Sequence, residues 1–222
     1  INEPQTIAGD ENTSIFQPEY SPDGRWLAYV SDESGWWQLY LYGLESGERR
    51  QLTTEAAEHG SPAWVQGLRT YAFSPDSRSI FIIRNTEGFN SLWKIEIENG
   101  QMQRILLATG YTSLDQIALA PDGKLALLAS GGSIPPRVVL VDLSGDVQII
   151  ARSTSEEIDP DIYAHVESIE CPGMDGKTVY GLFCPAHNPG FQGAGLPPLI
   201  VDVHGGPTDQ VKASFLPRAQ FF

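Results

Sequence analysis

A six-residue segment occurs three times in the first two thirds of the chain, and this repeat constrains the fold more than any other feature. It reads Y-S-P-D-G-R at residues 20–25, F-S-P-D-S-R at 73–78 and L-A-P-D-G-K at 119–124. The three prolines are 53 and then 46 residues apart. Self-similarity at such a period is typical of a repeat architecture, in which each copy is one supersecondary unit.

The repeated segment has the composition of a tight turn, at residues 21–24, 74–77 and 120–123. Proline presets φ at the first central position, aspartate bonds its own backbone, and glycine accepts a positive φ. Ser77 stands where the other two copies have glycine, which predicts that the middle turn is type I or otherwise relaxed. The aspartates at the same place in every copy are interpreted as structural, namely Asp23, Asp76 and Asp122.

Three short apolar segments that read as strands follow each turn. In the three repeats, the segment directly after the turn is RWLAYVSD, SIFIIRNT and KLALLASG, the next is WQLYLYGL, SLWKIEIE and RVVLVDLS, and the last is RRQLT, MQRILL and VQIIA. The segment directly after the turn is almost continuously apolar, as expected for a strand covered on both faces. Four strands repeated every 40–55 residues or so indicate a β-propeller.

The repeat therefore predicts a partial β-propeller of about three blades over residues 1–155. Three blades do not close a propeller, which typically needs at least four. Residues 1–8, INEPQTIA, are expected to be the last strand of a preceding blade, so that the chain begins within the propeller. Three tryptophans are expected to pack between blades, with the lining of a channel as the alternative for a loop tryptophan: Trp36, Trp37 and Trp64.

The segment Gly131-Gly132-Ser133 resembles part of the nucleophile elbow G-x-S-x-G of serine hydrolases. Pro135, however, stands where that motif requires glycine, and the segment lies between two predicted propeller strands. The elbow also needs a turn from a strand to a helix. We therefore interpret this segment as a loop.

A second region, residues 156–222, follows a polar and acidic linker at 153–165. A predicted hairpin joins strands 166–171 and 178–184 through the turn residues Asp175-Gly176. After a loop rich in proline and glycine, residues 198–203 read as a buried strand that leads directly into H-G-G-P at 204–207.

The glycine pair Gly205-Gly206 is the candidate functional site. Paired glycines after a buried strand let the backbone turn sharply and leave N–H groups uncovered, and such groups can stabilise the oxyanion of an acyl-transfer reaction. Hydrolases of the α/β-hydrolase fold carry an HGG-type segment at this position. An ordinary glycine turn is the alternative interpretation.

The blades, linker, D-G hairpin and P-L-I-V-x-V-H-G-G-P-T together resemble the prolyl oligopeptidase family of serine peptidases, in its acylaminoacyl-peptidase and dipeptidyl-aminopeptidase branch. The resemblance implies the N-terminal part of an α/β-hydrolase domain in residues 156–222. It also implies that Gly205 and Gly206 form an oxyanion segment with the N–H of Gly206 as a donor, and that His204 fixes the loop. The family's catalytic Ser, Asp and His would lie beyond Phe222, and the chain contains no G-x-S-x-G.

The function implied is hydrolysis of short peptides through an acyl-enzyme, with the propeller filtering substrates by size. The 222 residues by themselves are expected to be inactive and to be a stretch of a longer polypeptide. One alternative is an esterase-type acyl hydrolase on the same scaffold, because H-G-G-P does not distinguish peptides from esters. Another is a non-catalytic propeller that binds a partner.

Charge and motif spacing exclude several other classes. The net charge of −14 argues against nucleic-acid binding, and no apolar run approaches the roughly 20 residues of a membrane span. We expect no cofactor. We also expect no metal site, because the histidines lack ligand spacing with one another or with the cysteines: His59, His165, His187 and His204.

The two cysteines are expected to be free. If Asp175-Gly176 are the two turn residues, Cys171 faces Tyr180 and Cys184 faces Glu167, which separates the thiols by about 13 Å along the strands. A disulfide needs Cα atoms within about 7 Å. Reduced thiols predict a cytoplasmic protein. Besides a short peptide substrate, the expected partner is the remainder of the same polypeptide, and an oligomer is compatible with the sequence.

Overall fold

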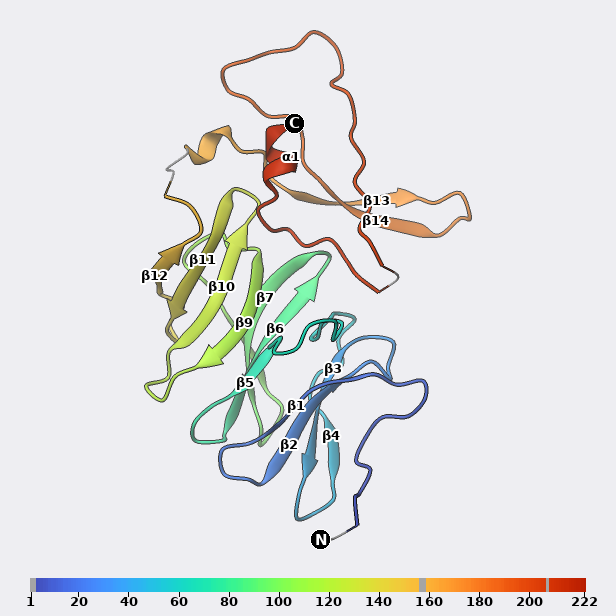
Figure 1. Cartoon of the computed structure of the whole chain (residues 1–222), viewed down its shortest axis with the longest axis vertical. Helices are drawn as coiled ribbons and strands as arrows, with labels where there is room; N and C mark the ends of the chain where they lie inside the picture. Colours follow the sequence, from blue (N-terminus) through green and yellow to red (C-terminus); the bar gives the residue numbers. More distant parts are fainter. Residues whose placement is uncertain (1–2, 156–158, 207) are drawn as a thin grey trace.

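The computed structural model describes residues 3–155, 159–206 and 208–222. Its first two thirds form three four-stranded antiparallel sheets that stand side by side (Figure 1). Blade 1 contains β1 (Ile15–Tyr20), β2 (Trp26–Ser31), β3 (Gln38–Gly43) and β4 (Arg49–Gln51). Blade 2 contains β5 (Tyr71–Phe73), β6 (Ser79–Thr86), β7 (Phe89–Glu96) and β8 (Met102–Ile105). Blade 3 contains β9 (Ser113–Leu119), β10 (Leu125–Gly131), β11 (Ile134–Val141) and β12 (Val147–Arg152).

In every blade the strands pair in chain order, which is the meander of a propeller blade. The prediction of a partial, mostly β propeller with three blades is therefore confirmed. The expected boundary between residues 155 and 156 falls at the edge of segment 156–158, which lies outside the described residues.

The continuous apolar run of β6 is explained by two cores. Ile80 and Ile82 lie in the core that blade 2 shares with blade 1, whereas Phe81 and Ile83 lie in the core that it shares with blade 3. Alternate side chains of a strand point to opposite faces of its sheet. A middle blade therefore buries both faces and needs apolar residues at consecutive positions.

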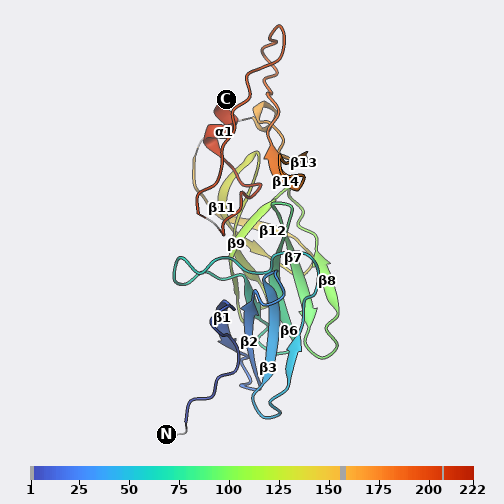
Figure 2. The same cartoon turned by 90° about the vertical axis from the view of Figure 1, so that its right-hand side faces the viewer.

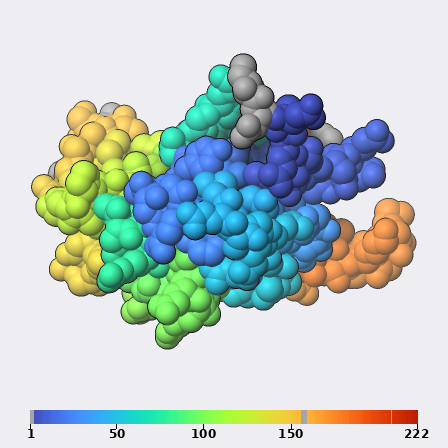
Figure 3. All heavy atoms as spheres, turned by 90° about the horizontal axis from the view of Figure 1, so that it is seen from below, coloured from blue at the N-terminus to red at the C-terminus, as the bar shows by residue number. Residues whose placement is uncertain are grey.

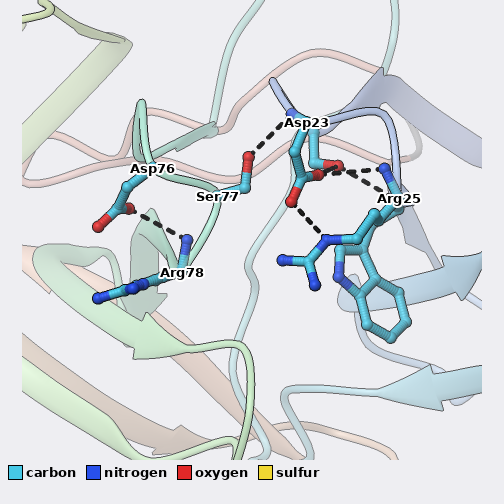
Figure 4. A network of polar contacts seen from close by, with 7 residues as sticks. Asp23, Arg25, Asp76, Ser77 and Arg78 are labelled. Atoms are coloured by element: carbon cyan, nitrogen blue, oxygen red, sulfur yellow. Dashed lines mark hydrogen bonds and ion pairs between the residues drawn. The ribbon is translucent and has the colours of Figure 1, made fainter.

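The three repeated turns have the same backbone conformation. Gly24, Ser77 and Gly123 all have positive φ, at 71°, 58° and 85°. The expectation that serine relaxes this position was wrong, whereas the alternative of a type I turn agrees with the hydrogen bond of 2.9 Å from the Ser77 N–H to the Ser74 carbonyl and with the absence of a positive φ at Asp76. Ser77 is buried, and its hydroxyl accepts a hydrogen bond of 3.0 Å from the N–H of Asp23 in the turn of blade 1 (Figure 4). This hydrogen bond between blades stabilises serine at a position whose positive φ favours glycine.

The conserved geometry of these turns supports the structural interpretation of their aspartates. Asp23 accepts hydrogen bonds from the Ser21 hydroxyl and from the backbone and side chain of Arg25. The Ser21 hydrogen bond is the largest of the causes that lower the pKa of Asp23 to about 2. The carboxylate thus stays charged and fixes the turn.

Two of the three tryptophans differ from expectation. Trp37 packs against the core between blades 1 and 2, as predicted, but Trp36 is 41% exposed and Trp64 58% exposed. Both exposed residues lie in connections between strands, where no second sheet covers them. Trp64 belongs to the long connection of residues 52–70 between β4 and β5.

The region after the blades lies over one end of blades 2 and 3 (Figures 1 and 2). It contains a short 3₁₀ helix (Pro160–Ile162), a hairpin of β13 (Glu167–Pro172) and β14 (Thr178–Phe183), and the short helix α1 (Pro217–Phe221). Seen from below, the hairpin projects clear of the blades (Figure 3). Gly132 and Ser133 form the tight connection between β10 and β11, so the loop prediction is confirmed there.

The hairpin β13–β14 differs from the prediction by one residue in register. Cys171 faces Val179, and Tyr180 faces Glu170. The turn has three residues rather than two, because Gly173 and Lys177 still pair through a hydrogen bond of 2.7 Å and Gly176 takes a positive φ of 81°. Such a loop combines a type I turn with a left-handed residue. Both cysteines are free, as predicted.

Two predicted strands are absent from the described residues. Residues 3–9 form no strand, and residues 1–2 of the proposed terminal strand lie outside the described residues. Residues 198–203 are extended but unpaired, and Leu199, Ile200, Val201 and Val203 are exposed. A strand needs a neighbour to satisfy its backbone, and no other described segment pairs with this one. The prediction of a buried strand was therefore wrong for this chain.

The described residues include no helix that is long and apolar enough to cross a membrane.

Candidate active site

The glycine pair lies at the end of the extended segment 198–203, where the chain turns back toward the blades. Gly206 has φ of 76°, in the left-handed region that favours glycine. A Cβ at Gly205 would have no atom within 4 Å, so this residue is in open space. Pro207, the last residue of H-G-G-P, lies outside the described residues.

The backbone donors of the pair are available. Gly205 and Gly206 are both exposed, and neither N–H donates to another part of the chain described by the structure. His204 is also exposed, and its Nδ1 lies 3.3 Å from the carbonyl oxygen of the next residue, Gly205. Two adjacent glycines with free N–H groups can bind an anionic oxygen.

Upstream of the pair, one ion pair ties the extended segment to α1. The Asp202 carboxylate lies 2.7 Å from the Arg218 guanidinium, with both side chains exposed. An exposed pair of this kind contributes at most about 1 kcal/mol. The upstream side of the glycine pair is therefore held loosely.

Downstream of the pair, the chain is anchored to two blades through Ala213. Its N–H donates to the carbonyl of Gly88 in the β6–β7 turn at 2.8 Å, and its carbonyl accepts from the Thr112 hydroxyl just before β9. Ala213 is buried. Both backbone groups of one residue are thus satisfied by the propeller, which fixes the segment that follows the glycines.

Further contacts extend this anchor. Lys212 pairs with Asp115 of β9 at 3.1 Å, and the Gln220 amide donates to the carbonyls of Gly132 at 2.9 Å and Ala164 at 3.1 Å. The turns β6–β7 and β10–β11 therefore both contact the region after the linker. A small hollow of about 10 Å³, the size of one water molecule, also lies between the blades and this region, lined among others by Glu58, Asn85 and Lys212.

Trp64 is the nearest propeller residue to the glycine pair, and the sequence did not predict this. Its indole carbons Cη2 and Cζ2 lie 3.4 and 3.7 Å from the position that a Cβ at Gly206 would occupy. The sequence did contain a signal, because Trp64 belongs to a 19-residue connection without strands, residues 52–70. Connections longer than about 12–15 residues are often functional.

The histidines do not form a catalytic or metal-binding group among the described residues. His59 is fully buried, with no hydrogen-bond partner for either ring nitrogen there, and burial lowers its pKa from 6.5 to about 4. His187 contacts the carbonyl oxygen of Asp161 at 2.6 Å. The described residues contain no cluster of three or more His, Cys, Asp or Glu side chains suited to a metal ion.

Another hollow, of about 430 Å³, lies along β12, and the described residues that line it are 149–155. A depression formed by one edge strand lacks the convergent polar groups of an active site. The glycine pair is therefore the better candidate for the site.

The fold joins three propeller blades to a further region that carries the exposed glycine pair. Solved structures of peptidases are similar to nearly the whole chain. A puromycin-hydrolyzing peptidase from Mycobacterium tuberculosis is 26% identical with a TM-score of 0.84, over 96% of this chain and 32% of that one. A puromycin hydrolase gives the same identity and TM-score, over 95% of this chain and 32% of its own.

Curated relatives agree. Over 88 residues, or 40% of this chain, it is 27% identical to dipeptidyl-peptidase 5 of Porphyromonas gingivalis. Over 66 residues, or 29% of the chain, it is 41% identical to the uncharacterized peptidase YuxL of Bacillus subtilis. These matches cover 12% and 9% of the two relatives. These relatives and solved structures are named as peptidases, and they support the resemblance to the prolyl oligopeptidase family that the motifs indicate.

One of the curated relatives is not named as a peptidase. The Tol-Pal system protein TolB of Alcanivorax borkumensis is 31% identical over 78 residues, which cover 35% of this chain and 16% of TolB. No family model matches the chain. The TolB match thus covers about a third of the chain, whereas the matches to the solved peptidases cover 95–96% of it.

Proposed function

We propose that this chain is one part of a serine peptidase that hydrolyses short peptides through an acyl-enzyme. The observation that carries the proposal is the exposed Gly205-Gly206 pair. Its N–H groups donate to no other group among the described residues, and the segment that follows it is anchored to two blades. In this role the N–H of Gly206 donates to the oxygen of the scissile carbonyl as negative charge develops there. Residues 156–222 then correspond to the beginning of an α/β-hydrolase domain.

The nucleophile and its base come from elsewhere in the complete protein. The chain contains no G-x-S-x-G, and its histidines are scattered over the described structure. The 222 residues alone are therefore inactive on this proposal. The propeller covers the hydrolase part and limits access to small substrates, and the partners are a short peptide and the rest of the polypeptide. The free thiols of Cys171 and Cys184 support a cytoplasmic location.

The experiment compares the complete protein with the isolated 222-residue chain. Both are incubated with a fluorophosphonate, which labels activated serines, and with aminoacyl p-nitroanilides. We expect labelling and anilide hydrolysis by the complete protein and neither by the chain. Absence of labelling and hydrolysis in the complete protein would contradict the proposal, and so would hydrolysis by the chain alone.

An esterase is the alternative on the same scaffold, since an oxyanion donor serves esters and amides equally. The ratio of kcat/KM for matched anilide and ester substrates of the complete protein separates the two. Turnover restricted to esters would replace the peptidase by an esterase. A non-catalytic binding propeller predicts no turnover of either.

A further inference from the structure

Trp64 has an environment that blade packing does not explain. It touches the position of Gly206 with one edge of the indole, yet 58% of the residue remains exposed. Tryptophans that support the blades behave differently, because Trp26 and Trp37 both pack against the core between blades 1 and 2. A large exposed indole beside a candidate oxyanion donor is available to contact a bound molecule.

The connection that carries Trp64 is held at both ends. On one side, Glu58 and Asn85 exchange two backbone hydrogen bonds of 3.0 and 2.8 Å, and the N–H of His59 donates to the carbonyl of Trp37 at 2.9 Å. On the other side, the N–H of Thr70 donates to the Gln17 side chain at 2.7 Å. The indole is thus presented by a loop whose ends are fixed to the blades.

The loop also lacks charge near the indole. Residues 61–68, S-P-A-W-V-Q-G-L, contain no ionisable side chain, and the nearby Arg69 is paired with Glu19. Val65, next to Trp64, is exposed as well. A charged substrate side chain would find no counter-ion in this loop, whereas an apolar or aromatic one would bury surface against the ring.

We propose that Trp64 is a specificity-determining residue that selects substrates with an aromatic or large apolar side chain on the acyl residue. The inference rests on the proposed function, in which Gly206 donates to the scissile carbonyl. An oxygen about 3 Å from the Gly206 N–H places the acyl residue within a few ångströms of the indole. The side chain of that residue then packs on Trp64, and this contact persists in the transition state.

The test uses the complete protein and two substrates, phenylalanyl and alanyl p-nitroanilide. We expect Trp64→Ala to lower kcat/KM for the phenylalanyl substrate on the order of 10-fold and to leave the alanyl substrate nearly unchanged. Trp64→Phe should retain most of the discrimination. Trp36→Ala is the matched control, because Trp36 is also partly exposed but has no atom within 4 Å of the Gly206 position. It should change neither value.

Fluorophosphonate labelling distinguishes a failure of the Trp64 proposal from a failure of the proposed function. Labelling of Trp64→Ala at the wild-type rate shows that the catalytic part is intact, and an unchanged phenylalanyl-to-alanyl ratio would then overturn the inference while leaving the proposed function standing. If Trp64→Ala does not fold, the ratio measured for Trp64→Phe and Trp64→Leu decides in its place, with Leu expected to lose more discrimination than Phe. No labelling or hydrolysis by the wild type would overturn both proposals.

Discussion

Ser77 and Asp23 join two blades through one hydrogen bond, in which the N–H of Asp23 donates to the Ser77 hydroxyl at 3.0 Å (Figure 4). Ser77 holds this position although its φ of 58° is unfavourable for a residue with a Cβ. The strain is of the order of 1–2 kcal/mol, similar to the gain from a hydrogen bond of this kind. Substitution of Ser77 by alanine or by glycine separates the strain from the hydrogen bond.

We expect Ser77→Ala to destabilise the propeller by about 1–2 kcal/mol, because it loses the hydrogen bond and retains the strained φ. Ser77→Gly loses the same hydrogen bond but removes the strain, and it should cost less. The midpoints of urea unfolding of the complete protein rank the variants, and hydrogen exchange of residues 21–26 locates the change. A ranking in which Ser77→Gly is the less stable variant would contradict this account of the turn.

The buried His59 should make the propeller sensitive to acid. Burial lowers its folded-state pKa from 6.5 to about 4, so the unfolded chain binds a proton between these values and the folded chain does not. The contribution of neutral His59 is fully present above pH 6.5 and is lost as pH falls toward 4, by about 3 kcal/mol in total.

The matched measurement is the melting temperature of wild type and His59→Phe from pH 7.5 to 4.5. His59→Phe keeps a buried ring without the titration, and its melting temperature should fall less over this range. Parallel curves for the two proteins would show that His59 does not titrate in this way.

The anchor at Ala213 predicts a local effect without a global one. Thr112→Val removes the hydroxyl that donates to the Ala213 carbonyl, at a net cost of about 1 kcal/mol, and leaves that carbonyl without its partner. Hydrogen exchange of residues 208–216 should accelerate severalfold. Thr70→Val is the control, because the Thr70 hydroxyl is buried and has no hydrogen-bond partner among the described residues. Equal exchange in the two variants would refute the anchor.

The sequence predicts the blades because each of them carries its own local information. The proline-aspartate turn and the following apolar strand recur in register, and the double burial of β6 follows directly from a middle blade. Ser77 was misjudged because the hydrogen bond that stabilises its conformation comes from another repeat. The hairpin register was one residue off because the Asp175-Gly176 pair fits a two-residue and a three-residue turn equally.

The candidate site was only partly predictable. Gly205 and Gly206 are recognisable as a motif, but Trp64 and Gly206 are 142 positions apart in the sequence, and only the fold places the indole beside the Cβ position of Gly206. Residues 198–203 have the apolar composition of a buried strand. Pairing, however, depends on neighbouring strands, and none of the other described segments supplies one.

The central claim is that the Gly206 N–H stabilises the oxyanion, and the most direct test compares alanine at the two glycines in the complete protein. Gly206 has a positive φ, and a Cβ there would contact Trp64, whereas a Cβ at Gly205 would meet no atom within 4 Å. Gly206→Ala should turn the N–H away and lower kcat for an aminoacyl anilide on the order of 100-fold, with little change in KM. Gly205→Ala should stay within a few fold of wild type. A kcat of Gly206→Ala equal to that of the wild type, measured on folded protein, would contradict the claim.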